Sequence, residues 1–496
     1  MKVAFLSAVA LLAGTAFAQR PLTVTVLHMN DIHSHLDPTP IRGVQYGGLA
    51  RVQTLIKGVR AKEKNVLLLN AGDVFQGTLY FNMYDGLADA TVLNEMGFDA
   101  QCLGNHEFDK GIPNLVEYIK RVNFPVLAAN VDTTNHPELG NVIKPYSIIT
   151  VDKQKVGVIG LVTDTTPTIA FIPETLKFQK HLAATQKAAD ELTAQGVNKI
   201  ILLTHIGYEE DMELGKQLRN VDLIVGGHSH TPLGTPPLEG WRPSVGKYPT
   251  VVKDADGKDL NVVQAWEWGK VLGRVKVTFD KKGNLVKVNE GEIMVVDSKI
   301  PEDKKIAGIL DAFRKPIDAI GSSQIGTSVA AITDRHTVGY FVSDSYLMAT
   351  QKLGADFALC NPGGVRSNLE AGKVTYGMAN AICPFRNTLT LVNMTGATII
   401  DLLNESKGSL IPSKGTSYTV AGGGVRDVMI NGAPLDPAKT YKVVVNNFMA
   451  QGGDSLNVLK AITDKVDTGF VDIDALVDYI KANSPLDTKG EIRVRR

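Results

Sequence analysis

Residues 24–33 read Val-Thr-Val-Leu-His-Met-Asn-Asp-Ile-His, an apolar, β-branched run that ends in a polar cluster. A short run of this composition predicts a buried strand. Three further runs have the same form and also lead into polar residues: 65–69 into Gly72-Asp73, 199–203 into Thr204-His205, and 221–225 into Gly226-Gly227-His228. The sequence therefore predicts several strands with a polar cluster at each carboxyl end.

The stretches between these strands have the spacing of helices, for example residues 50–60 and 183–194. Buried strands that alternate with helices indicate an α/β fold with a largely parallel sheet. In such sheets ligands bind beyond the carboxyl ends of the strands. We therefore expect the polar clusters to meet in one functional site.

Length and charge limit the class of protein. A chain of 496 residues is too long for one hydrophobic core, so we expect two or more domains. The composition, 44% hydrophobic and 21% charged, is that of a globular protein. Because the formal net charge is zero, we expect no nucleic acid polymer as a partner. A small phosphate ester would instead be held by local charge and metal ions.

The N-terminus has the pattern of an export signal. Met1-Lys2 is positively charged, residues 3–13 are apolar, and Ala16-Phe17-Ala18 fits a cleavage site, so residues 1–18 are predicted to be a signal peptide. The alternative is a membrane anchor, but the apolar stretch is shorter than the ~20 residues of a membrane span. We expect an exported protein, periplasmic or secreted, with no stable membrane anchor. The sequence leaves the oligomeric state open, with a monomer favoured.

The three cysteines do not form a disulfide scaffold. Cys102 is expected in the core, and a bridge between Cys360 and Cys383 remains an alternative to two free thiols. No CxxC pair is present, which argues against a zinc site built from thiolates.

The polar clusters supply the ligand types of a two-metal hydrolytic site, in which paired cations bind both the attacking and the leaving oxygen. The candidate ligands are Asp31, His33, Asp73, Asn105, His205, His228 and His230. Asp31 and His33 are two residues apart, so on an extended segment both would point to the same side. Asp73 is the candidate to bridge two ions, because a carboxylate has two oxygens. Oxygen and nitrogen donors without thiolates suit Mn²⁺, Zn²⁺, Co²⁺ or Mg²⁺.

His106 and Asp109 form a candidate catalytic pair. If Asn105 opens a helix, Asp109 can reach back to His106 within one turn. A carboxylate that orients a histidine and stabilises its protonated form is typical of acid–base catalysis. The alternative is that Asp109 only complements the positive end of the helix.

The remainder of the chain has a different character. Residues 301–321 are charged and have apolar residues at helical spacing, which predicts a helix that connects two domains. Beyond it lie three loops, residues 361–366, 384–388 and 446–454, which between them contain glycine, arginine and phenylalanine. Glycine permits close approach of the backbone, arginine binds oxyanions and phenylalanine stacks on rings, so these loops are candidate ligand-binding loops.

Taken together, the motifs resemble the 5′-nucleotidase family. The most specific stretches are residues 30–35, 71–73, 104–109, 227–230 and 447–454. The resemblance covers almost the whole chain after the signal peptide. It implies a four-layer α/β/β/α metallophosphoesterase sandwich at residues 19–300, a linker helix at 301–321, and a smaller mixed α/β substrate-binding domain at 322–496. It also implies hydrolysis of nucleoside 5′-monophosphates with two divalent metal ions.

The resemblance assigns roles residue by residue. Asp31, His33, Asp73 and His230 would hold one metal ion, and Asp73, Asn105, His205 and His228 the other. His106 and Asp109 would be the catalytic pair. The substrate would be bound by seven residues: Phe385 and Phe448 around the base, Asn387 and Asp454 at base or ribose, Arg366 and Arg335 at the phosphate, and Asn361 in the same loop as Arg366. A large rotation between the two domains is also implied.

Some positions depart from the family pattern. Gly339 stands where relatives often have a second arginine four residues after Arg335. Arg386 stands where many relatives have glycine, and could hinder access of the base or add an anion contact. Ser455-Leu456 replaces a common glycine and aromatic residue.

Two other functions remain in view. A 2′,3′-cyclic-nucleotide phosphodiesterase with 3′-nucleotidase activity shares the family, but such relatives tend to have tyrosines where this chain has Phe385 and Phe448. An exported solute-binding protein would also have two domains and an export signal, but it would not need the ligand set or the His106–Asp109 pair. Hydrolysis of UDP-sugars stays open as a second activity.

Overall fold

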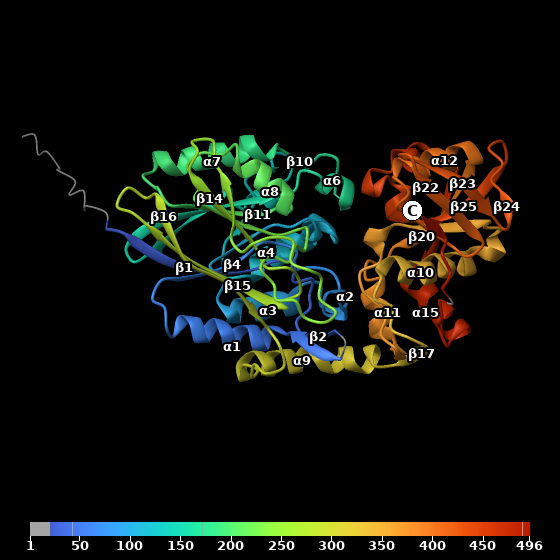
Figure 1. Cartoon of the computed structure of the whole chain (residues 1–496), viewed down its shortest axis with the longest axis horizontal. Helices are drawn as coiled ribbons and strands as arrows, with labels where there is room; N and C mark the ends of the chain where they lie inside the picture. Colours follow the sequence, from blue (N-terminus) through green and yellow to red (C-terminus); the bar gives the residue numbers. More distant parts are fainter. Residues whose placement is uncertain (1–19, 42, 171, 489) are drawn as a thin grey trace, which may run out of the picture.

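A computed structural model describes residues 20–41, 43–170, 172–488 and 490–496. The predicted signal peptide and its cleavage after Ala18 lie outside these residues. The chain folds into two bodies, seen side by side in Figure 1, with helix α9 (Lys304–Gly321) running below both. Within the described residues, no helix has the length and apolar character needed to cross a membrane.

Two six-stranded sheets form the centre of the first body. In spatial order, the first sheet contains β16 (Leu285–Val295), β15 (Val271–Phe279), β1 (Leu22–Met29), β4 (Val66–Asn70), β5 (Ala100–Cys102) and β6 (Val126–Leu127). The second contains β13 (Thr250–Lys253), β14 (Asp259–Gln264), β12 (Leu223–Gly226), β11 (Ile200–His205), β9 (Gln154–Val162) and β8 (Tyr146–Val151). In each sheet four adjacent strands are parallel, β1-β4-β5-β6 and β14-β12-β11-β9, and the others pair antiparallel.

The two sheets pack face to face, and helices cover both outer faces. Side chains of both sheets, such as Val26 and Leu69 from the first and Val158 and Leu203 from the second, share one buried cluster. The helices on the side of the first sheet are α1 (Leu49–Arg60), α2 (Leu79–Tyr84), α3 (Leu87–Met96), α4 (Gly111–Arg121) and α5 (Pro137–Gly140), and those on the side of the second are α7 (His181–Ala194) and α8 (Tyr208–Gly215). The expected α/β/β/α sandwich is confirmed.

Short elements complete the first body. They are β2 (Pro38–Ile41), β3 (Val44–Gly47), β7 (Val131–Asp132), β10 (Lys177–Phe178), α6 (Thr166–Ile169) and the 3₁₀ turn η1 (His106–Phe108).

The second body is smaller and contains mixed sheets. Its main sheet has the order β21 (Ile411–Pro412), β18 (Phe357–Cys360), β25 (Thr440–Asn446), β20 (Thr388–Thr395) and β26 (Lys465–Val471). A four-stranded sheet contains β24 (Ala433–Pro434), β23 (Gly424–Ile430), β22 (Thr416–Ala421) and β27 (Val494–Arg495), and β17 (Gln324–Ser328) pairs with β19 (Gly372–Thr375).

The helices of the second body lie on both sides of its main sheet. They are α10 (Arg335–Thr350), α11 (Tyr376–Ile382), α12 (Gly396–Glu405), α13 (Asn447–Ala450), α14 (Asn457–Ala461) and α15 (Asp472–Asn483), with 3₁₀ turns η2 (Gln351–Leu353), η3 (Pro362–Gly364) and η4 (Gly453–Ser455). All three cysteines are buried and free.

Helix α9 joins the two bodies and is anchored in the first. Asp303 caps its start by accepting hydrogen bonds from the amides of Lys305 and Ile306. Ile306 and Leu310 are buried in the core of the first body, and the other end of the helix meets α11 of the second. A helix therefore exists where the connector was expected, while the domain boundaries at residues 300 and 322 stay predictions.

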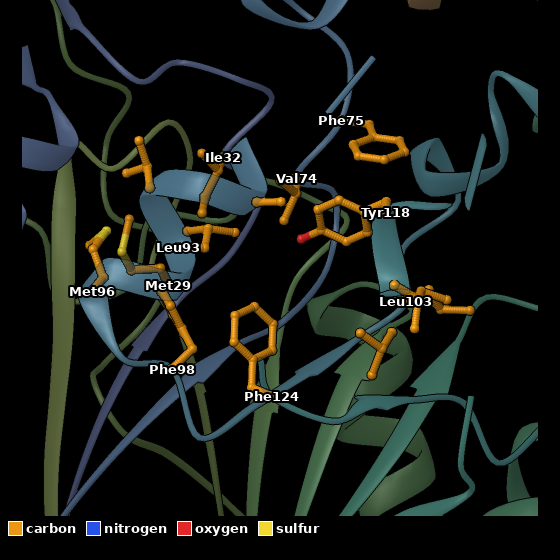
Figure 2. Close-up of a cluster of buried hydrophobic side chains, with 14 of the residues drawn as sticks. Met29, Ile32, Val74, Phe75, Leu93, Met96, Phe98, Leu103, Tyr118 and Phe124 are labelled. Atoms are coloured by element: carbon orange, nitrogen blue, oxygen red, sulfur yellow. The ribbon is translucent and has the colours of Figure 1, made fainter. Parts of the chain in front are cut away.

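The core of the first body fixes the loops that carry the polar clusters. Figure 2 shows Ile32, Val74 and Phe75 among the buried apolar side chains. All three are fully buried. Ile32 directly follows the candidate ligand Asp31, and Val74 and Phe75 follow Asp73. Burial of these side chains, worth about 1.5–3 kcal/mol each, holds the backbone of the two loops that carry Asp31 and Asp73.

Candidate active site

The candidate metal ligands come from five strand ends. Asp31 and His33 follow β1, Asp73 follows β4, Asn105 follows β5, His205 ends β11, and His228 and His230 follow β12. The first three strands belong to one sheet and the last two to the other. The site therefore lies where the carboxyl edges of the two sheets meet, as expected for α/β folds.

The prediction that Asp31 and His33 point to the same side because their segment is extended is wrong. The segment is not extended, because both residues have positive φ, 51° and 49°, as do Asp73 (54°), His228 (75°) and His230 (48°). Non-glycine residues in this region each cost about 1 kcal/mol or more and cluster at functional sites. Tight left-handed turns, rather than strand alternation, direct these side chains to one point.

One group of ligand atoms gathers around Asp31. Nε2 of His230 lies 3.1 Å from Oδ1 of Asp31 and 3.1 Å from Nε2 of His33. Nε2 of His33 lies 3.7 Å from Oδ2 of Asp73. Asp31, His33 and His230 thus form a cluster with the spacing of metal ligands. Asp73 stands at its border, where one of its oxygens can be shared with a second ion.

A second group gathers around Asp73 itself. Asp73, His205 and His228 have ligand atoms within metal-binding distance of one another, and Nε2 of His205 lies 3.0 Å from Oδ2 of Asp73. Asn105 lines the cavity in front of this group, and its Oδ1 is buried. Asp73 also forms a third group of this kind with His33 and His106, so it lies next to the atoms of both groups. The division of the ligands between two ions stays a prediction.

The donor set fits divalent cations. Oδ1 of Asn105 is a buried atom without a hydrogen-bond partner within the described residues. Oδ1 of Asp31 and Nε2 of His205 contact other candidate ligands, His230 at 3.1 Å and Asp73 at 3.0 Å. A buried polar atom without a partner is costly unless something else satisfies it. Three other polar atoms of the ligands have partners outside the ligand set. Nδ1 of His33 lies 2.9 Å from the carbonyl of Phe75, and Nδ1 of His205 lies 2.6 Å from the carbonyl of Ala71. Oδ2 of Asp31 accepts a hydrogen bond from Asn30 at 2.6 Å. The oxygen and nitrogen atoms that remain are grouped at ligand spacing and can bind a cation.

The electrostatics of the cluster favour a cation. Burial alone would lower the pKa of His205, but the carboxylates of Asp73 and Asp31 raise it to about 10. Burial would raise the pKa of Asp73, yet His205, His106 and His33 hold it well below its usual range. The carboxylates thus create a negative potential in a buried place, which a bound divalent ion would compensate.

His106 and Asp109 form the expected pair. Nδ1 of His106 donates to Oδ2 of Asp109 over 2.7 Å, and both side chains are 11% exposed. Asn105 precedes the 3₁₀ turn η1, and Asp109 closes it, so the reach across one turn is as predicted. Gln76, a buried residue that lacked a sequence signal, donates to the same oxygen of Asp109 at 3.3 Å. The carboxylate therefore has a fixed orientation toward the imidazole.

Glu107 stabilises the loop that carries Asp73 through hydrogen bonds to its backbone amides. Its buried carboxylate accepts from the amides of Asp73 at 3.0 Å, Val74 at 2.6 Å and Gly104 at 2.5 Å. Burial raises its pKa to about 7. This residue lies within the quoted motif at 104–109, but its role could not be predicted because the motif does not reveal which backbone amides lie above it.

Gly104 is required by the same packing. A Cβ atom built at this position would overlap the carboxylate and amide of Asp73. The backbone of the β5 loop can therefore approach Asp73 closely only if residue 104 is glycine.

A cavity of about 200 Å³ connects this cluster to the second body. Its lining from the first body includes Asp73, Asn105, His106, Asp109, His228 and His230, and from the second Asn361, Arg366, Phe385, Asn387, Phe448 and Asp454. Asp31, His33 and His205 are buried and are not part of this lining. Almost all predicted site residues therefore meet in one place, although they come from both halves of the chain.

The second-body residues are held by their own contacts. Asn361 donates to Asp454 at 2.6 Å and accepts from Asn446 at 3.0 Å. The Phe385 ring stacks on His106 with ring centroids 5.7 Å apart. Nη2 of Arg366 lies 3.3 Å from Nε2 of His33. Arg366 and Phe385 thus contact site residues of the first body, while Phe448, Asn361 and Asn387 line the same cavity.

Two first-body elements without a sequence signal lie at this cavity or contact the second body next to it. Ile169 and Ala170 of the α6 segment line it. Asn82 of α2 donates to Asn380 at 3.1 Å and to the carbonyl of Pro384 at 3.2 Å, directly before Phe385. These contacts depend on how the two bodies meet, which local sequence patterns do not encode.

Arg335 is not brought into this cavity. It begins α10, and its guanidinium lies 5.6 Å from the ring centroid of Trp268 on the first body. It lines a neighbouring cavity between the two bodies. Burial and then the Arg335 charge lower the pKa of Arg366, so the two guanidinium groups still influence each other. A phosphate contact by Arg335 stays a prediction.

Comparison with known protein families matches both halves of the chain. Residues 24–232 match the family described as calcineurin-like phosphoesterase. Residues 319–461 match the family described as 5′-nucleotidase, C-terminal domain.

Individual proteins match over nearly the full length. The chain is 32% identical to 5′-nucleotidase of Bos taurus over 528 residues, which covers 96% of this chain and 92% of that protein. It is 33% identical to snake venom 5′-nucleotidase of Naja atra, covering 92% and 96%. Among solved structures, the 5′-nucleotidase precursor from Thermus thermophilus is 39% identical, with a TM-score of 0.90 over 96% of this chain and 99% of that one.

Proposed function

The chain belongs to the 5′-nucleotidase family and is a metal-dependent phosphoester hydrolase, and we propose that it releases phosphate from nucleoside 5′-monophosphates. One observation supports this substrate class above all. A single cavity joins the acidic and histidine-rich cluster of the first body to Phe385 and Phe448 of the second. A 5′-nucleotide has its phosphate at one end and its base at the other, which suits these two ends.

In this proposal two divalent ions are held by the two ligand groups. Asp31, His33, Asp73 and His230 hold one, and Asp73, Asn105, His205 and His228 hold the other. Divalent ions at such a centre supply positive charge to phosphoryl oxygens and make water nucleophilic at neutral pH. Oxygen and nitrogen donors without thiolates are compatible with Mn²⁺, Zn²⁺, Co²⁺ or Mg²⁺.

The chain's own side chains position and neutralise the substrate. Asp109 accepts a hydrogen bond from Nδ1–H of His106, which fixes the imidazole and leaves Nε2 as the nitrogen that interacts with the substrate. Burial lowers the pKa of His106, but Asp109 and Asp73 raise it by more, so its protonated form is favoured more than in a free imidazole. Nε2 can then donate to a phosphoryl or leaving oxygen. The guanidinium of Arg366 supplies further positive charge at the phosphate.

The second body would orient the nucleoside. Phe385 and Phe448 stack on the base, and Asn361, Asn387 and Asp454 bind base or ribose through amide and carboxylate groups. Because these residues and the metal ligands lie in different bodies, the distance between phosphate and base determines which nucleotides fit. The proposal also includes a linker between the two domains at residues 301–321 and a substrate-binding role for the domain at residues 322–496. Residues 1–18 are proposed to be a signal peptide that directs export.

The test is phosphate release by purified residues 19–496 with Mn²⁺. AMP, 3′-AMP, 2′,3′-cyclic AMP and UDP-glucose are compared under identical conditions, with Asp73→Ala as the blank. Preference for AMP that is lost in Asp73→Ala is the expected result. Preference for 3′-AMP or the cyclic nucleotide would overturn the substrate assignment and leave the metal centre in place. Preference for UDP-glucose would show that a diphosphate bridge is the main target.

A further inference from the structure

The loop after β14 contacts the metal-ligand cluster at Asp31 and His230. Trp266, Trp268 and Gly269 all have positive φ, 54°, 59° and 63°, so residues 266–269 form a tight turn. This turn is tied to the end of β1: the amide of Trp268 donates to the carbonyl of Asp31 at 2.8 Å, and Asn30 donates to the carbonyl of Trp266 at 2.6 Å. The turn is therefore placed relative to Asp31 by one main-chain hydrogen bond and one from the Asn30 side chain.

Within this turn, Glu267 contacts a metal-ligand candidate directly. Its Oε2 lies 2.5 Å from Nδ1 of His230, and the residue is 3% exposed. On the opposite side of the same ring, Nε2 lies 3.1 Å from Oδ1 of Asp31 and 3.1 Å from Nε2 of His33. The carboxylate thus binds one ring nitrogen while the other points at the candidate ion position.

Lys270 completes the arrangement. Its Nζ lies 2.7 Å from Oε1 of Glu267, and the residue is 3% exposed. The ammonium also lies over the rings of Trp266 and Trp268, 4.4 and 4.0 Å from their centroids. Both oxygens of Glu267 therefore have a partner, so the side chain has one preferred orientation and its buried charge is compensated.

We propose that Glu267 is a positioning residue for His230, which fixes the imidazole with its proton on Nδ1 and its lone pair on Nε2 directed at one metal position. A histidine ligand whose second nitrogen donates to a carboxylate has a fixed tautomer and a more basic ligand nitrogen. Loss of such a partner typically lowers metal affinity about 10- to 100-fold. The inference rests on the proposed metal centre, because it gives His230 the role of a ligand.

A selective effect distinguishes positioning from a general structural role. Among the candidate ligands in the described part of the chain, Glu267 hydrogen-bonds to His230, which belongs to the group with Asp31 and His33. The group that contains Asn105, His205 and His228 is held by other contacts, such as that between His205 and the carbonyl of Ala71. Loss of the Glu267 carboxylate should therefore weaken one of two Mn²⁺ sites and leave the other unchanged.

The experiment is Mn²⁺ titration of the metal-free protein by calorimetry, with bound Mn²⁺ counted after dialysis and thermal unfolding of the metal-free protein as a second readout. Glu267→Gln keeps the shape of the side chain and removes its charge. The matched control is Asp344→Asn, which removes a buried carboxylate paired with Arg493 at 2.6 Å in the second body. We expect about 10- to 100-fold weaker binding at one site in Glu267→Gln and no change in Asp344→Asn.

A double-mutant cycle with His230→Gln tests the route of the effect. If Glu267 acts through His230, adding Glu267→Gln to His230→Gln should change Mn²⁺ affinity by less than about 2-fold. If Glu267→Gln does not fold, Glu267→Asp, which shortens the reach, should show the same selective loss. Affinities at both sites of the variant that equal those of the parent would overturn the inference. Failure of the parent to bind two Mn²⁺ would instead overturn the proposed metal centre.

Discussion

Replacement of Asp109 by Asn tests whether the His106–Asp109 pair takes part in catalysis. Asn keeps the shape of the side chain but cannot stabilise a protonated imidazole through its charge. The contact spans 2.7 Å between two largely buried side chains, so solvent does little to replace it. Gln76 donates to the same oxygen, which means that the carboxylate is already positioned before substrate binds.

The size of the effect follows from this contact. A hydrogen bond to a charged group contributes about 1.5–3 kcal/mol. If this energy is realised in the transition state, and about 1.36 kcal/mol corresponds to a tenfold change in rate, kcat should fall about 10- to 150-fold. KM for AMP should stay within about 2-fold, because the base and ribose contacts are elsewhere and uniform binding is unchanged.

The assay is phosphate release at saturating AMP and Mn²⁺, with bound metal measured in the same samples. Asp85→Asn is the matched control, because Asp85 is a nearby carboxylate that pairs with Lys110 outside the cavity. It should keep full kcat. If Asp109→Asn retains kcat within about 2-fold with both ions bound, the pair has no catalytic role. If it loses metal, Asp109 supports the metal centre instead.

Three further predictions concern other parts of the site. Gly104→Ala should lower kcat/KM by at least about 100-fold, because the added methyl overlaps the carboxylate of Asp73 and displaces this ligand. Bound Mn²⁺ should fall in parallel, and a full metal content in the variant would contradict this prediction. Phe385→Leu should raise KM for AMP about 10-fold with little change in kcat, because one stacking contact is worth about 1–3 kcal/mol; an unchanged KM would show that Phe385 does not bind the base. Burial raises the pKa of Asp211 from 3.8 to about 8, so the folded protein retains a proton that the unfolded chain loses, and this residue costs stability as pH rises from about 4 to 8. Asp211→Asn should therefore gain stability relative to the parent between about pH 5 and pH 9, measured by thermal unfolding, whereas a pH-independent difference would show that Asp211 ionises normally.

Strand ends and ligand types were predictable because they depend on local sequence. Runs such as residues 24–29 and 199–205 have few alternatives to a buried strand, and each ends in a distinctive cluster. The helical spacing of residues 50–60 and 183–194 likewise corresponds to α1 and α7. The existence of two sheets, rather than one, came from the family resemblance and not from periodicity.

The backbone geometry of the site was less predictable. Asp31 and His33 converge through left-handed turns, which non-glycine residues adopt only where tertiary packing compensates the strain. Ile32 and Val74 supply part of that packing from the core, but a single isoleucine in a polar cluster does not reveal it.

Supporting residues were missed because their partners are distant in the chain. Glu107 binds the amides of the Asp73 loop, which follows a different strand, and Glu267 contacts His230 across a long loop. The sequence around Trp266-Glu267-Trp268-Gly269 is distinctive, yet periodicity assigns it no function. The phosphate contact assigned to Arg335 stays a prediction, since the motif does not reveal that its guanidinium lies near the ring of Trp268.

The most direct test of the account compares AMP with ribose 5-phosphate, which has the same phosphate ester but no base. If the cluster of the first body acts on the phosphate while Phe385 and Phe448 bind the base, kcat/KM for AMP should exceed that for ribose 5-phosphate by at least about 30-fold, the combined value of two stacking contacts at the lower end of their range. Equal kcat/KM for the two substrates would contradict a site shared between the two bodies.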